Sequence, residues 1–525
     1  MHWTDLPLIR HEAHFGRTMR CFAERPANLG TMLAATFARH GAREAVVDGP
    51  YRLDYAKVDR VTDRIAGHLS RLGVARGDRV ALLLANEREF VYSLLATIKL
   101  GAIAVPLNTR EQRPELAFIL NQCAARAIVF DAGLAERLPS TIDAPGLVRL
   151  TVGGVAAGAI AFDELLETHS PAAPPCDAGE DETAVILYTS GTTGRPKGAM
   201  LTHFNLVHSC LHYRVCMGLT ADDRSVLAVP ASHVTGLAAI LLAMFAVGGC
   251  VVMQREFKAR AFLELAAAER MTHTLVVPAI YNLCLRDPDF PRFDLSAWRI
   301  GGFGGAPMPE GTLRALAEKL PRLALVNAYG ATETTSPTTI MPPGLQPANL
   351  DSVGVVVPCG ELRVMDAAGF EVPAGESGEI WIAGPMVVPG YWDNPEATAR
   401  EFCDGFWKSG DIGSVDSQGF VRVFDRLKDM INRGGYKIYG AEVESVLSLH
   451  PAVVESALIA VPDPVLGEKT HAYVVARDAL CTADTLREHC ARHLADYKVP
   501  DFITLLSGPL PRNANGKLLK RALRP

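Results

Sequence analysis

Residues 27–170 alternate between helical patterns and short apolar runs, and this alternation limits the fold more than any other feature of the sequence. Tyr55–Leu72 and Glu89–Leu100 have the apolar spacing of amphipathic helices. Arg79–Leu84 and Ile103–Pro106 are runs typical of buried strands. Strands that are separated by helices usually pair in parallel, with helices covering the sheet. We therefore predict an α/β fold built from helix-covered sheets.

The 525-residue chain is too long for a single core, because hydrophobic cores stop growing near roughly 250–300 residues. After Asp351, glycines and short β-runs predict a smaller β-rich lobe, and after Asp425 mixed strands and helices predict an α+β unit. We expect a large N-terminal domain and a small, mobile C-terminal domain, at residues 1–425 and 426–525. The N-terminal domain is expected to contain subdomains at about residues 1–175, 176–350 and 351–425.

Composition excludes several classes of function. The net charge is −6 and no long basic run occurs, which argues against nucleic acid as a partner. The 11 cysteines form no CxxC pair, so we expect reduced thiols and a cytoplasmic protein. The longest apolar stretch, Leu237–Met253, is split by Gly248 and Gly249 and predicts a buried helix and strand, with no transmembrane segment. The Pro- and acid-rich run Ser170–Glu182 predicts an exposed connector.

The run Tyr188–Gly198 is the strongest local signal. It follows an apolar strand pattern, Ala184–Leu187, and holds three glycines, four Ser/Thr hydroxyls and Lys197. Such a loop can wrap phosphate oxygens with its N–H groups while the lysine adds positive charge. The spacing is not that of a Walker A loop. Composition alone fits an ordinary surface loop equally well.

This run resembles the phosphate-binding signature of the adenylate-forming superfamily, which includes acyl-CoA synthetases, peptide-synthetase adenylation domains and luciferases. Further runs resemble that family's motifs in the same order, namely Tyr329–Glu333, Lys408–Asp411, Asp425–Asp429, Gly434–Ile438 and Pro511–Lys517. Six ordered matches over about 330 residues identify the chain as a member of this superfamily. Tyr497–Pro500 resembles the Tyr-Lys-x-Pro run of free-standing CoA ligases.

The resemblance implies an ATP site with Mg²⁺. The residues implied to bind ATP or AMP are Thr189, Ser190, Gly191, Thr192, Thr193, Gly194, Lys197, Gly304, Gly305, Ala306, Tyr329, Gly330, Asp411 and Arg426. Among them, Tyr329 is implied to stack on adenine, and Asp411 and Arg426 to lie at the ribose. The implied catalytic residues are Lys517, Thr332 and Glu333, and Glu333 is also the implied Mg²⁺ ligand, since this hard cation prefers oxygen.

The acyl pocket is implied to lie near His233, Val234 and Gly330, although a core histidine is an alternative for His233. Many relatives have Phe where Ser232 stands, which leaves the shape of the pocket open. Peptide-synthetase domains place an Asp near His233 to pair a substrate ammonium, but the run Ala231–Phe245 contains no Asp, Glu, Lys or Arg. An unpaired ammonium in an apolar pocket is costly. We therefore expect an uncharged fatty, alicyclic or aryl acid.

Together these features predict a ligase that forms an acyl-AMP and then an acyl thioester with coenzyme A. The small domain is implied to rotate about Lys428 between the two steps, and Gly434, Gly435 and Lys437 are implied to border the CoA channel. Two alternatives stay open: an acyl-AMP ligase that loads a carrier protein, and a non-catalytic homologue that binds nucleotide. The expected partners are the carboxylic acid, ATP and CoA, and a homodimer also stays open.

Overall fold

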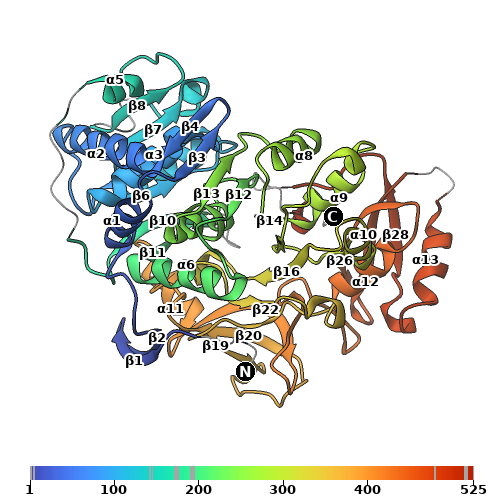
Figure 1. Ribbon diagram of the computed structural model, residues 1–525. Coiled ribbons are helices and arrows are strands. Elements are labelled where there is room, and N and C mark those ends of the chain that lie inside the picture. The colour runs from blue at the N-terminus through green and yellow to red at the C-terminus, as the bar shows by residue number, and fades with distance from the viewer. Residues whose placement is uncertain are drawn as a thin grey trace. The chain divides into compact units, whose positions relative to one another are not determined.

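The computed structural model describes residues 3, 6–140, 144, 146–168, 170, 177–189, 195–477, 481–512 and 518–523. The chain forms two compact units (Figure 1). The first contains Met1–Leu362 and Ile382–Trp407, and the second contains Arg363–Trp381 and Lys408–Pro525. These units divide the chain at other points than residue 425, and the domain boundary at that residue stays a prediction.

A seven-stranded sheet in the first unit contains the two strands that flank the predicted phosphate loop. Its order is β11 (Lys197–Thr202), β10 (Thr183–Thr189), β6 (Ile103–Pro106), β5 (Arg79–Leu83), β7 (Ala125–Asp131), β8 (Val148–Val152) and β9 (Ile160–Ala161). Neighbouring strands are parallel except for β10 and β11, which form an antiparallel hairpin. This sheet confirms the predicted mostly parallel pairing.

A nine-stranded sheet is the second large sheet of the same unit. Its order is β18 (Val355–Val356), β17 (Thr339–Ile340), β16 (Ala324–Tyr329), β15 (Ile300–Phe303), β14 (His273–Val276), β12 (Arg224–Leu227), β13 (Cys250–Met253), β3 (Glu44–Asp48) and β4 (Tyr51–Asp54). The strands from β16 to β3 pair in parallel, and β4, β17 and β18 are antiparallel. The carboxyl ends of β15 and β16 therefore meet at one edge.

Helices accompany both sheets in the first unit (Figure 1). They are α1 (Leu29–His40), α2 (Tyr55–Arg71), α3 (Arg88–Lys99), α4 (Arg113–Gln122), α5 (Phe162–Glu167), α6 (His203–Met217), α7 (Ala243–Val247), α8 (Ala259–Ala268), α9 (Pro278–Leu285), α10 (Glu310–Lys319) and α11 (Pro395–Glu401). The apolar stretch predicted as a helix and a strand forms a buried π-helix, η2 (Thr235–Leu242), then α7 and β13. In the described part of the chain, every helix is too short or too polar to span a bilayer.

The second unit has its own α+β core. A five-stranded sheet has the order β25 (Tyr436–Ile438), β24 (Ile431–Arg433), β27 (Gly467–Ala476) and β26 (Val453–Asp463), with β28 (Phe502–Leu506) also on β27. Helices α12 (Gly440–Ser448) and α13 (Ala483–Ala491) contribute Leu447 and Leu486 to its buried cluster. The predicted β-rich lobe corresponds to a further sheet, whose residues are divided between the ranges of the two units; its strands are β19 (Glu361–Met365), β20 (Gly378–Ala383), β21 (Phe402–Cys403), β22 (Phe406–Val415) and β23 (Val421–Arg426).

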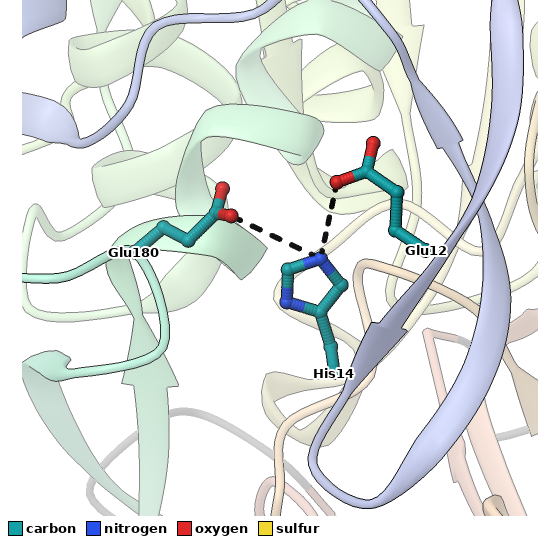
Figure 2. Close-up of side chains that lie close together, drawn as sticks. All are labelled: Glu12, His14 and Glu180. Carbon is teal, nitrogen blue, oxygen red and sulfur yellow. Dashed lines mark ion pairs between the residues drawn. The ribbon is translucent and has the colours of Figure 1, made fainter.

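An ion-pair network joins the N-terminal hairpin, β1 (Ile9–His14) and β2 (Arg17–Phe22), to the segment before β10. The buried guanidinium of Arg25 bonds both oxygens of Glu12, at 2.7 and 2.8 Å, and Glu180 at 2.9 Å. Figure 2 shows Glu12 and Glu180 on either side of the His14 ring, with His14 Nε2 at 3.5 and 3.9 Å from their oxygens. The three side chains have a geometry that could hold a metal ion, but Arg25 already supplies positive charge to both carboxylates.

The prediction that Ser170–Glu182 is an exposed connector is wrong for part of its described residues. Ser170 is buried, and Ala178 is 3% exposed. Glu182 pairs with Arg76, and Glu180 pairs with Arg25. Acidic residues that composition marks as solvated are here held by arginines far away in the sequence.

Replacing Arg25 by methionine is expected to destabilise the first unit, because it leaves two carboxylates without their buried cation. We expect a cost near the lower end of the roughly 3–5 kcal/mol seen when one partner of a buried ion pair is removed. The measurement is the midpoint of thermal unfolding. Arg10→Met is the matched control, since Arg10 also bonds Glu12 but is 59% exposed. Equal shifts for the two variants would contradict this account.

Candidate nucleotide site

The β10–β11 hairpin brings two predicted site residues opposite each other. Thr189 ends β10, Lys197 begins β11, and the two are direct partners across the hairpin. In an antiparallel pair, directly opposite side chains lie on the same face. Between them, the predicted phosphate-binding residues Ser190, Gly191, Thr192, Thr193 and Gly194 lie outside the described residues.

The Lys197 side chain points into the protein and is buried. Its ammonium bonds both carboxylate oxygens of Glu401 at 2.7 Å and the Tyr391 hydroxyl at 3.3 Å. It also lies 4.4 Å from the centre of the Tyr391 ring. An ammonium has three N–H donors, and these contacts occupy all three. Burial alone would raise the pKa of Glu401, but the bonds from Lys197 and Tyr391 hold it below its ordinary value.

Tyr391 links this ion pair to Glu333. Its hydroxyl lies 2.9 Å from Glu333 Oε1 and 2.5 Å from Glu401 Oε2. With one hydrogen, the hydroxyl donates to one of these carboxylates at a time. The backbone fixes Tyr391 here because Trp392 N donates to Gly198 O at 2.7 Å, which adds this segment to the edge of β11.

Sequence reasoning missed both Tyr391 and Glu401. A local signal existed for Glu401, since Asn394 followed by Pro395 is a typical helix start and places Glu401 two turns later. The structure confirms the start: the Asn394 side chain accepts from Ala397 N at 3.0 Å and caps α11, which ends at Glu401. The pairing with Lys197, 204 residues away, has no local signal.

Glu333 is buried in a short 3₁₀ turn, η4 (Thr332–Thr334), which begins three residues after the end of β16. Its backbone carbonyl accepts from Val388 N at 3.0 Å, and Thr189 Oγ1 lies 3.5 Å from its carboxylate. Burial raises the pKa of the Glu333 carboxyl, against the lowering effects of backbone and Tyr391 hydrogen bonds. Hydroxyl and carboxylate oxygens therefore gather at Glu333, and this is the donor set that a hard cation such as Mg²⁺ prefers. The predicted catalytic residue Thr332 is half-buried in the same turn.

The predicted adenine residues lie where two parallel strands end. Gly304 follows β15 and passes so close to its neighbour that a Cβ there would lie 2.2 Å from Ala328 O. Gly305 has a φ of +75°, a conformation that favours glycine. Tyr329, the last residue of β16, is half-buried, whereas Ala306 and the predicted Gly330 are exposed. Glycine backbone after β15 allows a flat ring to approach closely, and Tyr329 ends the neighbouring strand.

The predicted acyl-pocket residues differ in exposure. Val234 is buried, whereas His233 is exposed and its Nδ1 accepts from Thr235 N at 3.2 Å. The alternative of a core histidine is therefore wrong. The residues that follow form the buried, uncharged π-helix η2, and π-helical turns are frequent at functional sites.

In the second unit, the two predicted ribose residues form an ion pair. Asp411 and Arg426 are partners on the antiparallel strands β22 and β23, and Arg426 Nε lies 2.8 Å from Asp411 Oδ1. Arg426 also donates to Ser409 O at 3.1 Å. Asp411 is buried, the strand pairing fixes its backbone, and the Arg426 guanidinium holds its carboxylate.

The predicted hinge and CoA-channel residues lie in two exposed turns of the second unit. Lys428 is in the turn after β23. Gly434 and Gly435 connect β24 to β25 with φ values of +59° and +93°, and Lys437 on β25 is exposed. A two-residue hairpin turn with positive φ at both positions favours glycine, asparagine or aspartate. The predicted catalytic Lys517 lies outside the described residues.

Comparison with known proteins covers nearly the whole chain. The chain is 37% identical to a feruloyl-CoA synthase of Amycolatopsis sp over 93% of this chain and 95% of that protein. It is 34% identical to the long-chain-fatty-acid–CoA ligase FadD13 of Mycobacterium tuberculosis, over 95% and 98% of the two chains. O-succinylbenzoate CoA synthetase of Bacillus subtilis, solved with its acyl-adenylate intermediate, has a TM-score of 0.84 and 30% identity, covering 95% and 98%. That enzyme has also been solved with ATP and magnesium.

Family models match both parts of the chain. The AMP-binding enzyme model matches residues 33–392, and the model of the AMP-binding enzyme C-terminal domain matches residues 442–517. Tyr188–Gly198, the buried Glu333 and the adjoining Tyr391 all lie within the first match. This chain therefore belongs to the family of AMP-binding enzymes.

Proposed function

We propose that the protein is an AMP-forming acid–CoA ligase that uses ATP, Mg²⁺ and coenzyme A. The observation that carries the proposal is the buried Glu333 carboxylate beside Thr189, the last residue of β10. The relatives of the chain include acid–CoA ligases. In the first step, a carboxylate oxygen of the acid attacks the α-phosphorus of ATP and pyrophosphate leaves. In the second, the CoA thiol attacks the acyl carbonyl, loses its proton, and AMP leaves.

The residues divide this work between charge and orientation. Glu333 and Thr189 would hold Mg²⁺, which neutralises phosphate charge when it is bound. Tyr329 and the Gly304 backbone would hold the adenine, and the Asp411–Arg426 pair would hold the ribose. Lys517 would stabilise the charge that gathers on the α-phosphate during attack.

Two relatives support an uncharged acid as substrate. One is named for an aryl acid and the other for long-chain fatty acids. The buried apolar π-helix beside Val234 fits both, and it offers no charged group to an amino acid or a dicarboxylate. We also propose that the protein acts in the cytoplasm, which the free thiols of its described cysteines support. A homodimer is a further proposal that sedimentation analysis can test.

A pyrophosphate-release screen tests the substrate class. Ferulic acid, cyclohexanecarboxylic acid and fatty acids of graded length should give higher kcat/KM than amino acids or malonate, because burying an unpaired charge is costly. With ATP and the acid present, and CoA as the only acceptor added, the thioester and AMP should form in equal amounts. An amino acid as the best substrate, or a thioester formed only on a carrier protein, would contradict the proposal.

The Glu333→Gln variant is expected to need more Mg²⁺ for adenylation, because a neutral amide is a poorer ligand for a hard cation. The measurement is the Mg²⁺ concentration at half-maximal pyrophosphate release. Thr334→Val serves as a control within the same turn, since the Thr334 hydroxyl bonds the backbone of Ala331. An unchanged Mg²⁺ titration for Glu333→Gln would remove this residue from the metal site.

The two half-reactions are expected to depend on different ends of the small domain. Lys517→Ala should slow acyl-AMP formation by roughly 10²–10³-fold, the usual effect of losing one stabilising contact at developing charge. It should still convert supplied acyl-AMP and CoA to the thioester. Gly435→Leu should show the reverse pattern, because the added side chain would crowd the thiol path.

A strain control is needed because Gly435 has a φ of +93°. Gly419→Leu supplies it, since Gly419 has a φ of +87° and a Cβ added there would meet no atom within 4 Å. This control should retain both half-reactions. If Lys517→Ala loses both steps equally while folded, the proposed domain rotation is wrong for this protein.

A further inference from the structure

The buried lysine of the phosphate-loop motif is paired with a carboxylate, and this pairing suggests a role different from the one its sequence position predicts. We infer that Lys197 is a positioning residue: through Glu401 and Tyr391 it holds Glu333 in place for Mg²⁺, and it does not contact the phosphates of ATP. The inference rests on the proposed Mg²⁺ site at Glu333.

The first observation behind this inference is the set of contacts that Lys197 makes. Both oxygens of Glu401 lie 2.7 Å from its ammonium, and the Tyr391 hydroxyl at 3.3 Å takes the third N–H. A phosphate oxygen could gain a bond only by displacing one of these partners. Displacing Glu401 would leave its half-buried carboxylate with only the half-exposed Arg400 guanidinium, 3.2 Å away, and losing the buried partner of a charge away from water is costly.

The second observation behind this inference is the position of the Tyr391 hydroxyl. It touches Glu401 at 2.5 Å and Glu333 at 2.9 Å, so Lys197, Glu401, Tyr391 and Glu333 form one continuous chain of polar contacts. All four side chains belong to the first compact unit. Groups that hydrogen-bond a metal-binding carboxylate orient it and tune its affinity. The Lys197–Glu401 pair therefore fixes the Tyr391 ring and, through its hydroxyl, the Glu333 carboxylate.

The third observation behind this inference is the backbone structure around Glu401. The capped helix α11 fixes this residue at its last position, and Thr398 Oγ1 accepts from Tyr391 N at 3.0 Å. The backbones of Tyr391 and Glu401 are thus held together by the fold, whereas their hydroxyl and carboxylate groups are held by Lys197. Within this fixed backbone, the Lys197 ammonium orients the Glu401 and Tyr391 side chains.

The two roles of Lys197 predict opposite effects for Glu401→Gln. If Lys197 positions Glu333, removing the Glu401 charge should weaken metal binding as much as Lys197→Met does. If Lys197 instead binds phosphate, Glu401→Gln should free the ammonium and strengthen nucleotide binding. A double variant separates them further, because effects within one network are not additive.

The experiment measures binding of Mn²⁺, detected by electron paramagnetic resonance, in the presence of α,β-methylene-ATP and the full-length protein. Lys197→Met, Glu401→Gln and Tyr391→Phe should each weaken Mn²⁺ binding by roughly 10–100-fold. The Lys197→Met/Glu401→Gln double variant should be no weaker than either single variant. Thermal unfolding checks that each variant is folded.

Lys99→Met is the matched control, since Lys99 also pairs with acidic side chains, Asp59 and Asp63, but takes no part in the site. It should leave Mn²⁺ binding unchanged. Tighter nucleotide binding by Glu401→Gln, or additive losses in the double variant, would overturn the inference. Failure of Glu333→Gln to weaken Mn²⁺ binding of the otherwise normal protein would instead overturn the proposed metal site, and the inference with it.

Discussion

A lysine taken out of water needs a partner of opposite charge, and the pairing of Lys197 with Glu401 organises the candidate site around it. Removing one partner of such a pair leaves an uncompensated charge, which is far more costly than exchanging both. Three segments distant in sequence converge on this pair: the β10–β11 hairpin, the turn η4 after β16, and the segment from Tyr391 to the end of α11. The ion pair and the Tyr391 hydroxyl thereby place Glu333 beside Thr189, the last residue of β10.

The sheets explain why the other residues of the first unit are available to a ligand. Parallel strands leave their carboxyl ends at one edge, where loops are free to carry function. Gly304 follows β15 and Tyr329 ends its neighbour β16 in the nine-stranded sheet, and Thr189 ends a strand of the seven-stranded sheet. In the second unit, Asp411 and Arg426 are fixed by a different device, direct pairing across two antiparallel strands.

Much of the fold could be predicted, because its signals are local. The Tyr55 helix begins where Asp54 caps it, and the strand Ile103–Pro106 has the bounds that its apolar run predicts. Glu180 and Glu182 were expected to be solvated, and Glu401 was missed, because their arginine and lysine partners lie far away in the sequence. Motifs identify residue types at a site, whereas long-range ion pairs appear only when the chain is folded.

The most direct test of this account is the position of the Lys197 side chain in a crystal structure with Mg²⁺ and α,β-methylene-ATP. The account predicts that the Lys197 ammonium still bonds Glu401, with Glu333 on the metal and the Tyr391 hydroxyl between the two carboxylates. An ammonium that bonds a phosphate oxygen, with Glu401 turned away from it, would contradict the account.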